Sequence, residues 1–253
     1  MPLKFTSHAS NNIFLGQHAI IVDEIKLVKW VASTLISKHN HILRIISSDK
    51  KDKKLKIKDT VVRSVIKKVL HAIDTDHRDG LLFQHISWIC AAINKNKYDL
   101  LKAPHCRIAD KGQDNLIIHL NKNNKITSIS ICEDKATSNV RDTIRDKVFP
   151  EFAVYESGEK DSELESEVLS MLEKHTDTNR AESLIKSIFW DQARNYKINV
   201  TITNEDPFRI FKDYENCIKG NVDRRTGNTI QIHDLRNWFT QFAKKIEDYL
   251  NSL

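Results

Sequence analysis

The sequence predicts a mixed α/β fold, in the broader sense that includes α+β, with a mixed sheet core, a helical N-terminal region and C-terminal helices. Three observations predict it. Apolar residues recur at helical spacing through much of residues 1–95, short β-branched runs replace them over residues 114–132, and helical spacing returns towards the C-terminus. We therefore expect a single unit over residues 1–253, with a mainly helical region over 1–100 and a sheet core with C-terminal helices over 101–253.

The clearest helix is predicted over residues 61–73, where apolar side chains lie three and four positions apart. Asp59 or Thr60 stands where its N-cap belongs. Ser138 or Asn139 similarly begins a polar helix that we expect to extend to Val148 and to end at Pro150, because proline disrupts a helix interior. The same apolar spacing predicts further helices over residues 20–35, 82–93, 164–172, 184–189 and 235–250, the last one capped by Asp234.

Strands are predicted where the period of the sequence changes to two. Residues 114–120 are short and apolar, residues 121–124 have the composition of a turn, and residues 126–132 are rich in β-branched side chains. This order predicts two antiparallel strands joined by a hairpin. A shorter strand is expected over residues 105–108, and alternation over residues 196–202 predicts another.

The hairpin places three charged residues where they can meet. Asp114 begins the first strand, and Glu133-Asp134-Lys135 ends the second. Side chains two positions apart on a strand share a face, so Glu133 and Lys135 project together and the neighbouring strand brings Asp114 beside them. Two converging carboxylates repel each other unless a cation lies between them, and Mg²⁺ or Mn²⁺ prefers such oxygen ligands. Asp114 and Glu133 are therefore candidate metal ligands.

These three groups suit the hydrolysis of a nucleic-acid backbone. The cation would polarise the phosphoryl group, and Lys135 could orient the attacking water or stabilise charge that develops on the phosphate. The triplet Glu24-Ile25-Lys26 has the same spacing, but it lies in a predicted helix, where side chains two apart diverge by about 200°. The competing interpretation of Glu133 and Lys135 is an ion pair at the end of a surface strand.

The segment from Asp114 to Lys135 resembles the core motif of the PD-(D/E)xK nucleases, the restriction-endonuclease-like superfamily, in which an acid on one strand precedes (D/E)xK on the next. Gln113 stands here in place of the proline of that motif. The wider stretch over residues 131–152 resembles the HamA-type nuclease subunits of the Hachiman antiphage defence system and the related AbpA proteins. This resemblance implies a Mg²⁺-dependent deoxyribonuclease, with a PD-(D/E)xK core over residues 101–253, that works with a helicase partner of the HamB type.

Charge also points to a nucleic-acid partner. The chain has a net charge of +6 and a pI near 9.0, and basic proteins gain affinity for polyanions by releasing counterions. Lysines between residues 50 and 58, among them Lys51, Lys53 and Lys54, form a candidate phosphate-contacting loop; a solvated loop is the alternative. Arg141 and Arg145 are four apart on the predicted helix after the motif and could contact phosphates, or pair with neighbouring aspartates.

The remaining features exclude several classes. The first residues lack the pattern of a secretory signal and no apolar run approaches about 20 residues, so we expect a cytoplasmic protein without membrane spans. The four cysteines form no CxxC pair, which indicates neither a disulfide framework nor a zinc site. His71, Asp74, Asp76 and His77 favour a polar helix end over a metal site, and His119 favours a hydrogen-bonded strand residue. The alternative function is a catalytically silent nucleic-acid-binding or scaffolding subunit with a nuclease-like fold.

Overall fold

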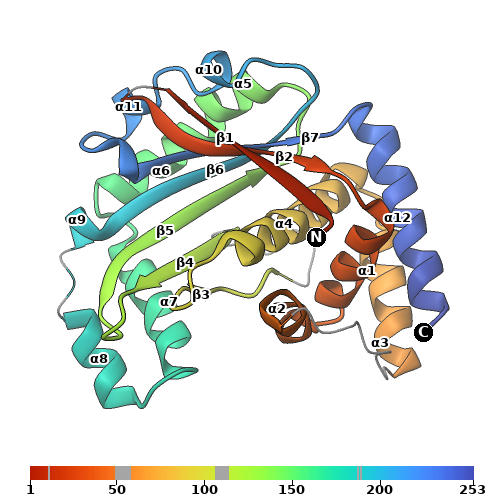
Figure 1. Ribbon diagram of the computed structural model, residues 1–253, viewed down its shortest axis with the longest axis horizontal. Helices are drawn as coiled ribbons and strands as arrows, with labels where there is room; N and C mark the ends of the chain where they lie inside the picture. The colour runs from red at the N-terminus through yellow and green to blue at the C-terminus, as the bar shows by residue number, and fades with distance from the viewer. Residues whose placement is uncertain (11, 49–57, 106–113, 187, 189) are drawn as a thin grey trace.

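A computed structural model describes residues 1–10, 12–48, 58–105, 114–186, 188 and 190–253 (Figure 1). Within this part of the chain, seven strands form one sheet in the order β1-β2-β7-β6-β5-β4-β3. The mixed α/β class predicted from the sequence is confirmed. The strands are β1 (Leu3–Ser10), β2 (Phe14–Ile21), β3 (Leu100–Leu101), β4 (Asn115–Leu120), β5 (Ile126–Lys135), β6 (Arg194–Ile202) and β7 (Arg225–Gln231).

The sheet has a parallel centre and antiparallel sides. β2, β7, β6 and β5 run parallel to one another, whereas β1 pairs antiparallel with β2, and β4 pairs antiparallel with both β5 and β3. The carboxyl ends of β5, β6 and β7 therefore lie at one edge of the sheet. Ligands of open α/β sheets usually bind at such an edge.

Helices cover both faces of the sheet. In the described part of the chain they are α1 (Glu24–Leu35), α2 (His39–Ser48), α3 (Asp59–Val65), α4 (Thr75–Asn94), α5 (Val140–Thr143), α6 (Phe149–Glu156), α7 (Asp161–Glu173), α8 (Thr178–Lys186), α9 (Trp190–Ala193), α10 (Pro207–Ile210), α11 (Tyr214–Cys217) and α12 (Leu235–Asn251). Two π-helical turns, η1 (Ile66–Leu70) and η2 (Ile144–Val148), continue α3 and α5, and a 3₁₀ turn, η3 (Val222–Arg224), precedes β7.

The side chains form two apolar cores, one on each face of the sheet. α1, α4 and α12, which gather beside one another in Figure 1, bury Trp30, Trp88 and Phe242 in the first core. The second core joins β5 and β6 to α5, α6 and α7, and contains Ile131 and Phe152. Each fully buried side chain of this size contributes about 1.5–3 kcal/mol. The two cores hold the carboxyl end of β5 between α4 and the α5–α6 segment.

The N-terminal region contains two strands that the sequence did not predict. The helix expected over residues 20–35 begins only at Glu24, after the Asp23 side chain accepts a hydrogen bond from the Lys26 amide. Ile20 and Ile21 belong instead to β2, which pairs with β1 and β7. Residues 61–73 are helical as α3 and η1 up to Leu70, and residues 82–93 lie within α4.

Two boundaries around the predicted site also differ. Asn139 is the N-cap of α5 as predicted, but Pro150 does not end the helical segment, because it occupies the first turn of α6, where its missing N–H costs no hydrogen bond. Of the short strand expected over residues 105–108, His105 is not in a strand and residues 106–108 lie outside the described residues; a short strand, β3, lies instead at Leu100–Leu101.

The helices predicted near residues 164–172 and 235–250 are confirmed as α7 and α12, and the strand at residues 196–202 is confirmed as β6. The helix expected over residues 184–189 begins earlier, at Thr178, and ends at Lys186 as α8. Among the described residues, no helix combines the length and apolar character that a membrane-spanning segment needs.

Candidate active site

Asp114, Glu133 and Lys135 come together at the end of the β4–β5 hairpin. Asn115 pairs with Cys132, which puts Asp114 next to the last residues of β5. The ammonium nitrogen of Lys135 lies 2.5 Å from Oε2 of Glu133 and 3.4 Å from Oδ2 of Asp114. The predicted convergence of the three side chains is confirmed; their catalytic role stays a prediction.

Asp114 is held from three directions. Its Oδ2 accepts hydrogen bonds from the Asp134 amide, at 2.9 Å, and from Lys135. Its Oδ1 accepts a hydrogen bond from the side-chain amide of Gln84, which lies on α4. Sequence reasoning missed Gln84, because it precedes Asp114 by 30 residues on a helix with no local motif to mark it. The orientation of Asp114 therefore depends on a residue of the N-terminal region.

The site is buried and densely charged. Glu133 is 7% exposed, and burial raises its pKa to about 7, with the Asp114 carboxylate adding to the rise and Lys135 opposing it. Burial alone would lower the pKa of Lys135, but the Asp114 and Glu133 carboxylates outweigh burial and raise that pKa above its usual value. Lys135 is therefore an ammonium ion at neutral pH, a donor and never an acceptor.

Asp134, between Glu133 and Lys135 in sequence, points to the opposite face of β5. Its carboxyl group accepts hydrogen bonds from the side-chain amides of Asn115 on β4 and of Asn199 on β6, the latter at 2.6 Å. Asp134 is 4% exposed, and its burial together with the nearby Asp114 charge raises its pKa to about 8. The two amides satisfy this buried group and connect the three strands below the site.

A cavity of about 540 Å³ opens in front of Asp114 and Lys135. Its walls come from the first turns of α4, from Thr137 after β5, from Thr143 and Lys147 on the α5–η2 segment, and from Arg236 at the start of α12. Arg236 pairs with Asp76, at 2.9 Å, and with the buried Asp79, at 3.0 Å. The exposed Lys147 and Arg236 place cations on the rim of the cavity.

The His71–His77 cluster lies at the start of α4. Asp74 is the N-cap, accepting from the His77 amide, and its second oxygen lies 3.0 Å from the His77 ring. His71 bonds instead to Glu247 on α12. These contacts match the predicted polar helix end. His119 is likewise the hydrogen-bonded strand residue expected, contacting Asp99 and Ser130.

The two arginines after the motif already have partners. Arg141 donates to Asp213 at 2.8 Å and to the backbone carbonyl of Ile210, so it ties α5 to α10 and the segment that follows α10. Arg145 pairs with Asp142 at 2.9 Å and with Asp146 at 2.6 Å, as the solvated-face interpretation predicted. The candidate phosphate contacts Lys51, Lys53 and Lys54 lie outside the described residues.

Glu24, from the second triplet with Glu-x-Lys spacing, has a different partner. It begins α1 and pairs with Lys245 of α12 at 2.5 Å. The helix therefore separates Glu24 from Lys26, as the spacing argument required.

The donor set at the hairpin end fits a hard divalent cation. Asp114 and Glu133 direct carboxylate oxygens towards the Lys135 ammonium, so a positive charge already lies between them. The contact of Glu133 with Lys135 is made by Oε2 of its carboxylate. No group of three or more His, Cys, Asp or Glu side chains arranged for a metal ion occurs among the described residues. Water and substrate oxygens would complete the coordination, as is usual for Mg²⁺.

Comparison of the chain with protein-family profiles and with curated proteins finds no match. The likeness to PD-(D/E)xK nucleases therefore depends on the residues from Asp114 to Lys135 and on their arrangement in space.

Proposed function

We propose that this protein hydrolyses phosphodiester bonds of DNA in a reaction that depends on Mg²⁺, with Mn²⁺ as a substitute. One observation carries the proposal: an acid preceding one strand and a Glu-x-Lys pair ending the next strand converge beside an open cavity. The site lies at the carboxyl end of a parallel strand, the edge at which α/β folds usually place their chemistry.

Each residue has a role that follows from its contacts. Asp114 and Glu133 would hold the cation, and Gln84 and the Asp134 amide orient Asp114 for that task. When bound, the cation supplies Lewis-acid stabilisation of the phosphoryl group and lowers the pKa of a water molecule. Lys135, kept protonated by its two carboxylate neighbours, donates hydrogen bonds to the attacking water or to the phosphoryl oxygens.

The surroundings of the site support a polyanionic substrate. Lys135 and Lys147 line the cavity together with Arg236, which pairs with Asp76 and Asp79, and the net charge of the chain is +6. DNA, rather than RNA, and a helicase partner of the HamB type come from the resemblance to the Hachiman nuclease subunits, and they form part of this proposal. A defence role would require that the partner restrains cleavage until DNA damage or infection is sensed.

A catalytically silent nucleic-acid-binding or scaffolding role is the second candidate. It is favoured by the direct contact of Lys135 with both carboxylates, since such a triad can neutralise a strand end without any metal. In that case the ion pairs would stabilise the β4–β5 hairpin, and no metal ion would replace the contacts between Lys135 and the two carboxylates.

Incubation of the purified protein with supercoiled plasmid, with Mg²⁺ and with excess EDTA, separates the two candidates. The nuclease proposal requires cleavage that EDTA abolishes and that Glu133→Gln removes. The assay is repeated with the co-expressed helicase partner and ATP, because a partner can control the activity. Binding of DNA without cleavage under every one of these conditions would favour the silent subunit.

A further inference from the structure

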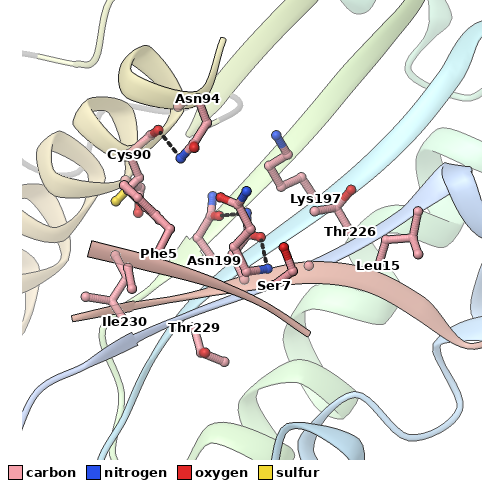
Figure 2. Close-up of a pocket in the computed structure, with 16 residues that line it drawn as sticks. Phe5, Ser7, Leu15, Cys90, Asn94, Lys197, Asn199, Thr226, Thr229 and Ile230 are labelled. Carbon is pink, nitrogen blue, oxygen red and sulfur yellow. Dashed lines mark hydrogen bonds between the residues drawn. The ribbon is translucent and has the colours of Figure 1, made fainter. Parts of the chain in front are cut away.

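A second cavity, of about 320 Å³, lies between the sheet and α4, away from the proposed active site. Strands β1, β2, β6 and β7 form its floor, and Ser87, Cys90, Ala91 and Asn94 of α4 form its roof (Figure 2). It shares no lining residue with the cavity in front of Asp114 and Lys135. Its volume is at the lower end of the range of about 300–1,000 Å³ that is typical of small-molecule sites.

The lining of this cavity is polar and positively charged. Among the described residues that line it, Lys197 is the single charged one, and none is an aspartate or a glutamate. The Lys197 side chain is half-buried, and within the described residues its ammonium group forms no hydrogen bond and no ion pair. An ammonium group in a cavity without a carboxylate partner favours the binding of an anion beside it.

Ser87 gives a second, independent indication of a ligand. Its side chain is 3% exposed, and its hydroxyl oxygen has no hydrogen-bond partner in the described part of the chain. Buried hydroxyl groups are normally hydrogen-bonded, so a partner is expected inside the cavity that Ser87 lines. Ser87 approaches from α4, whereas Lys197 approaches from β6, so the two groups face the cavity from opposite sides.

Hydrogen bonds hold two asparagine side chains of the cavity floor in a fixed orientation. Asn199 donates to Asp134, Asn228 donates to Asn199 at 2.9 Å, and Asn228 in turn accepts from the backbone N–H of Gln17 at 3.0 Å. Each Asn side chain has two N–H groups and uses one of them in these bonds, which leaves the other available as a donor. Figure 2 shows Asn199 beside Lys197 on β6, across the cavity from Cys90 and Asn94.

We propose that this cavity is a binding site for a small phosphomonoester. The donors come from α4, β6 and β7, so they surround the ligand and match the several acceptor directions of a phosphate group better than the planar oxygens of a carboxylate. The cavity volume of about 320 Å³ is roughly ten times the volume of about 30 Å³ that one water molecule occupies. A phosphate group alone would therefore not fill it. Phe5, Leu15 and Ile230 provide an apolar wall for the organic part of the ester.

The test uses the full-length protein in metal-free buffer and two probes, inorganic phosphate and adenosine monophosphate, with binding measured by calorimetry and by ³¹P NMR. We expect saturable binding of at least one probe. Lys197→Met and Ser87→Ala should each weaken it, Lys197→Met by about tenfold because it removes the charge-assisted contact. Lys197→Arg should restore part of the affinity, and Lys219→Met, at an exposed lysine elsewhere, should leave it unchanged.

A third variant distinguishes this site from the active site. Lys135→Met removes the cation of the proposed nuclease site and should not change phosphate binding in the second cavity. Ala91→Leu places a larger side chain in the cavity and should abolish binding, while thermal melts check that the fold is retained. Absence of saturable binding, equal affinities of the wild type and Lys197→Met, or loss of binding in Lys135→Met alone would each overturn the proposal. None of these results depends on whether the protein cleaves DNA.

Discussion

Two adjacent acidic residues of β5, Glu133 and Asp134, have different environments on the two faces of the strand. Glu133 shares its face with a cation, Lys135, that also contacts Asp114, and Lys135 and Asp114 line a cavity. Asp134, one residue further on, lies on the other face, where two neutral amides surround its carboxyl group. Ion pairs can exchange partners when a new ion arrives, whereas buried amide contacts fix a strand in place. Asp134 also lines the cavity, so the two acids differ in their partners: the ion pair of Glu133 suits exchange for a bound cation, and the amide contacts of Asp134 suit holding the site together.

The largest expected effect is on the Glu133 face. Glu133→Gln and Lys135→Met should each reduce DNA cleavage by at least about 100-fold, since one removes a proposed metal ligand and the other a donor to the reacting groups. Plasmid cleavage with Mg²⁺ measures the effect, and thermal melts confirm folding. Cleavage at the wild-type rate by either folded variant would mean that this face is not the active site.

On the Asp134 face the main effect should be on stability. Asp134→Ala leaves the side-chain amides of Asn115 and Asn199 without their acceptor in a buried position. Unsatisfied buried groups cost about 1–3 kcal/mol each, so we expect the free energy of unfolding to fall by about 3 kcal/mol. Urea denaturation measures this loss. At temperatures where the variant is folded, it should still cleave DNA, because Asp114 accepts from the backbone of Asp134 and not from its side chain.

If Asp134→Ala instead abolished cleavage while stability stayed at the wild-type level, the two faces would not differ in the way proposed. A matched variant, Asn199→Ala, removes one of the amides and leaves the acid, and should cost less stability than Asp134→Ala because only one contact is lost.

The part of the site that the sequence predicts is the part built from local contacts. The hairpin from Asp114 to Lys135 follows from its turn, where the Asn121 side chain accepts from the amides of Asn123 and Lys125. Alternation along β5 then determines which side chains share a face. Gln84 could not be predicted, because its contact with Asp114 depends on how α4 packs against the sheet.

The difference between local and distant contacts also explains which helices and strands the sequence predicts. Helices with a clear apolar face, such as α7 and α12, are recognisable from spacing alone. β2 pairs with β7, more than 200 positions further along the chain, as in the contact of the Gln17 amide with Asn228, which are 211 positions apart. Residues 14–21 also pair with the neighbouring β1 along their whole length, so a local strand and a distant one together hold β2 in the sheet, and the distant one leaves no local signal. Pro150 misleads for a related reason, since its position in a new first turn depends on the π-helical turn before it.

Asp114 contacts the Lys135 ammonium and the backbone amide of Asp134, and its substitution should alter metal binding selectively. Asp114→Asn keeps the size of the side chain but removes the charge that would hold Mg²⁺, so affinity for the ion should fall by about tenfold or more. DNA binding without metal should be retained or improved, because one carboxylate no longer repels phosphate. Calorimetric titration with Mn²⁺ measures the first effect. Equal Mn²⁺ affinities of the wild type and Asp114→Asn would exclude Asp114 as a ligand.

The smallest expected effect is at Gln84, which acts on the site only through Asp114. Gln84→Met keeps the length of the side chain but removes the amide that donates to Oδ1 of Asp114. Asp114 retains the Asp134 amide and Lys135, so we expect its orientation to loosen rather than to be lost. Outer contacts of this kind typically change metal affinity or activity by about 10–100-fold, and the two remaining contacts place Gln84→Met at the lower end. Cleavage should therefore fall by about tenfold, and higher Mg²⁺ concentration should restore most of it, because the defect is in ligand orientation. Gln84→Glu sharpens the test: it keeps the shape but replaces the donor with a further carboxylate facing Asp114, so cleavage at low Mg²⁺ concentration should fall further than in Gln84→Met. A loss that excess Mg²⁺ does not restore would give Gln84 a direct part in the chemistry and extend the active site from the β4–β5 hairpin onto α4.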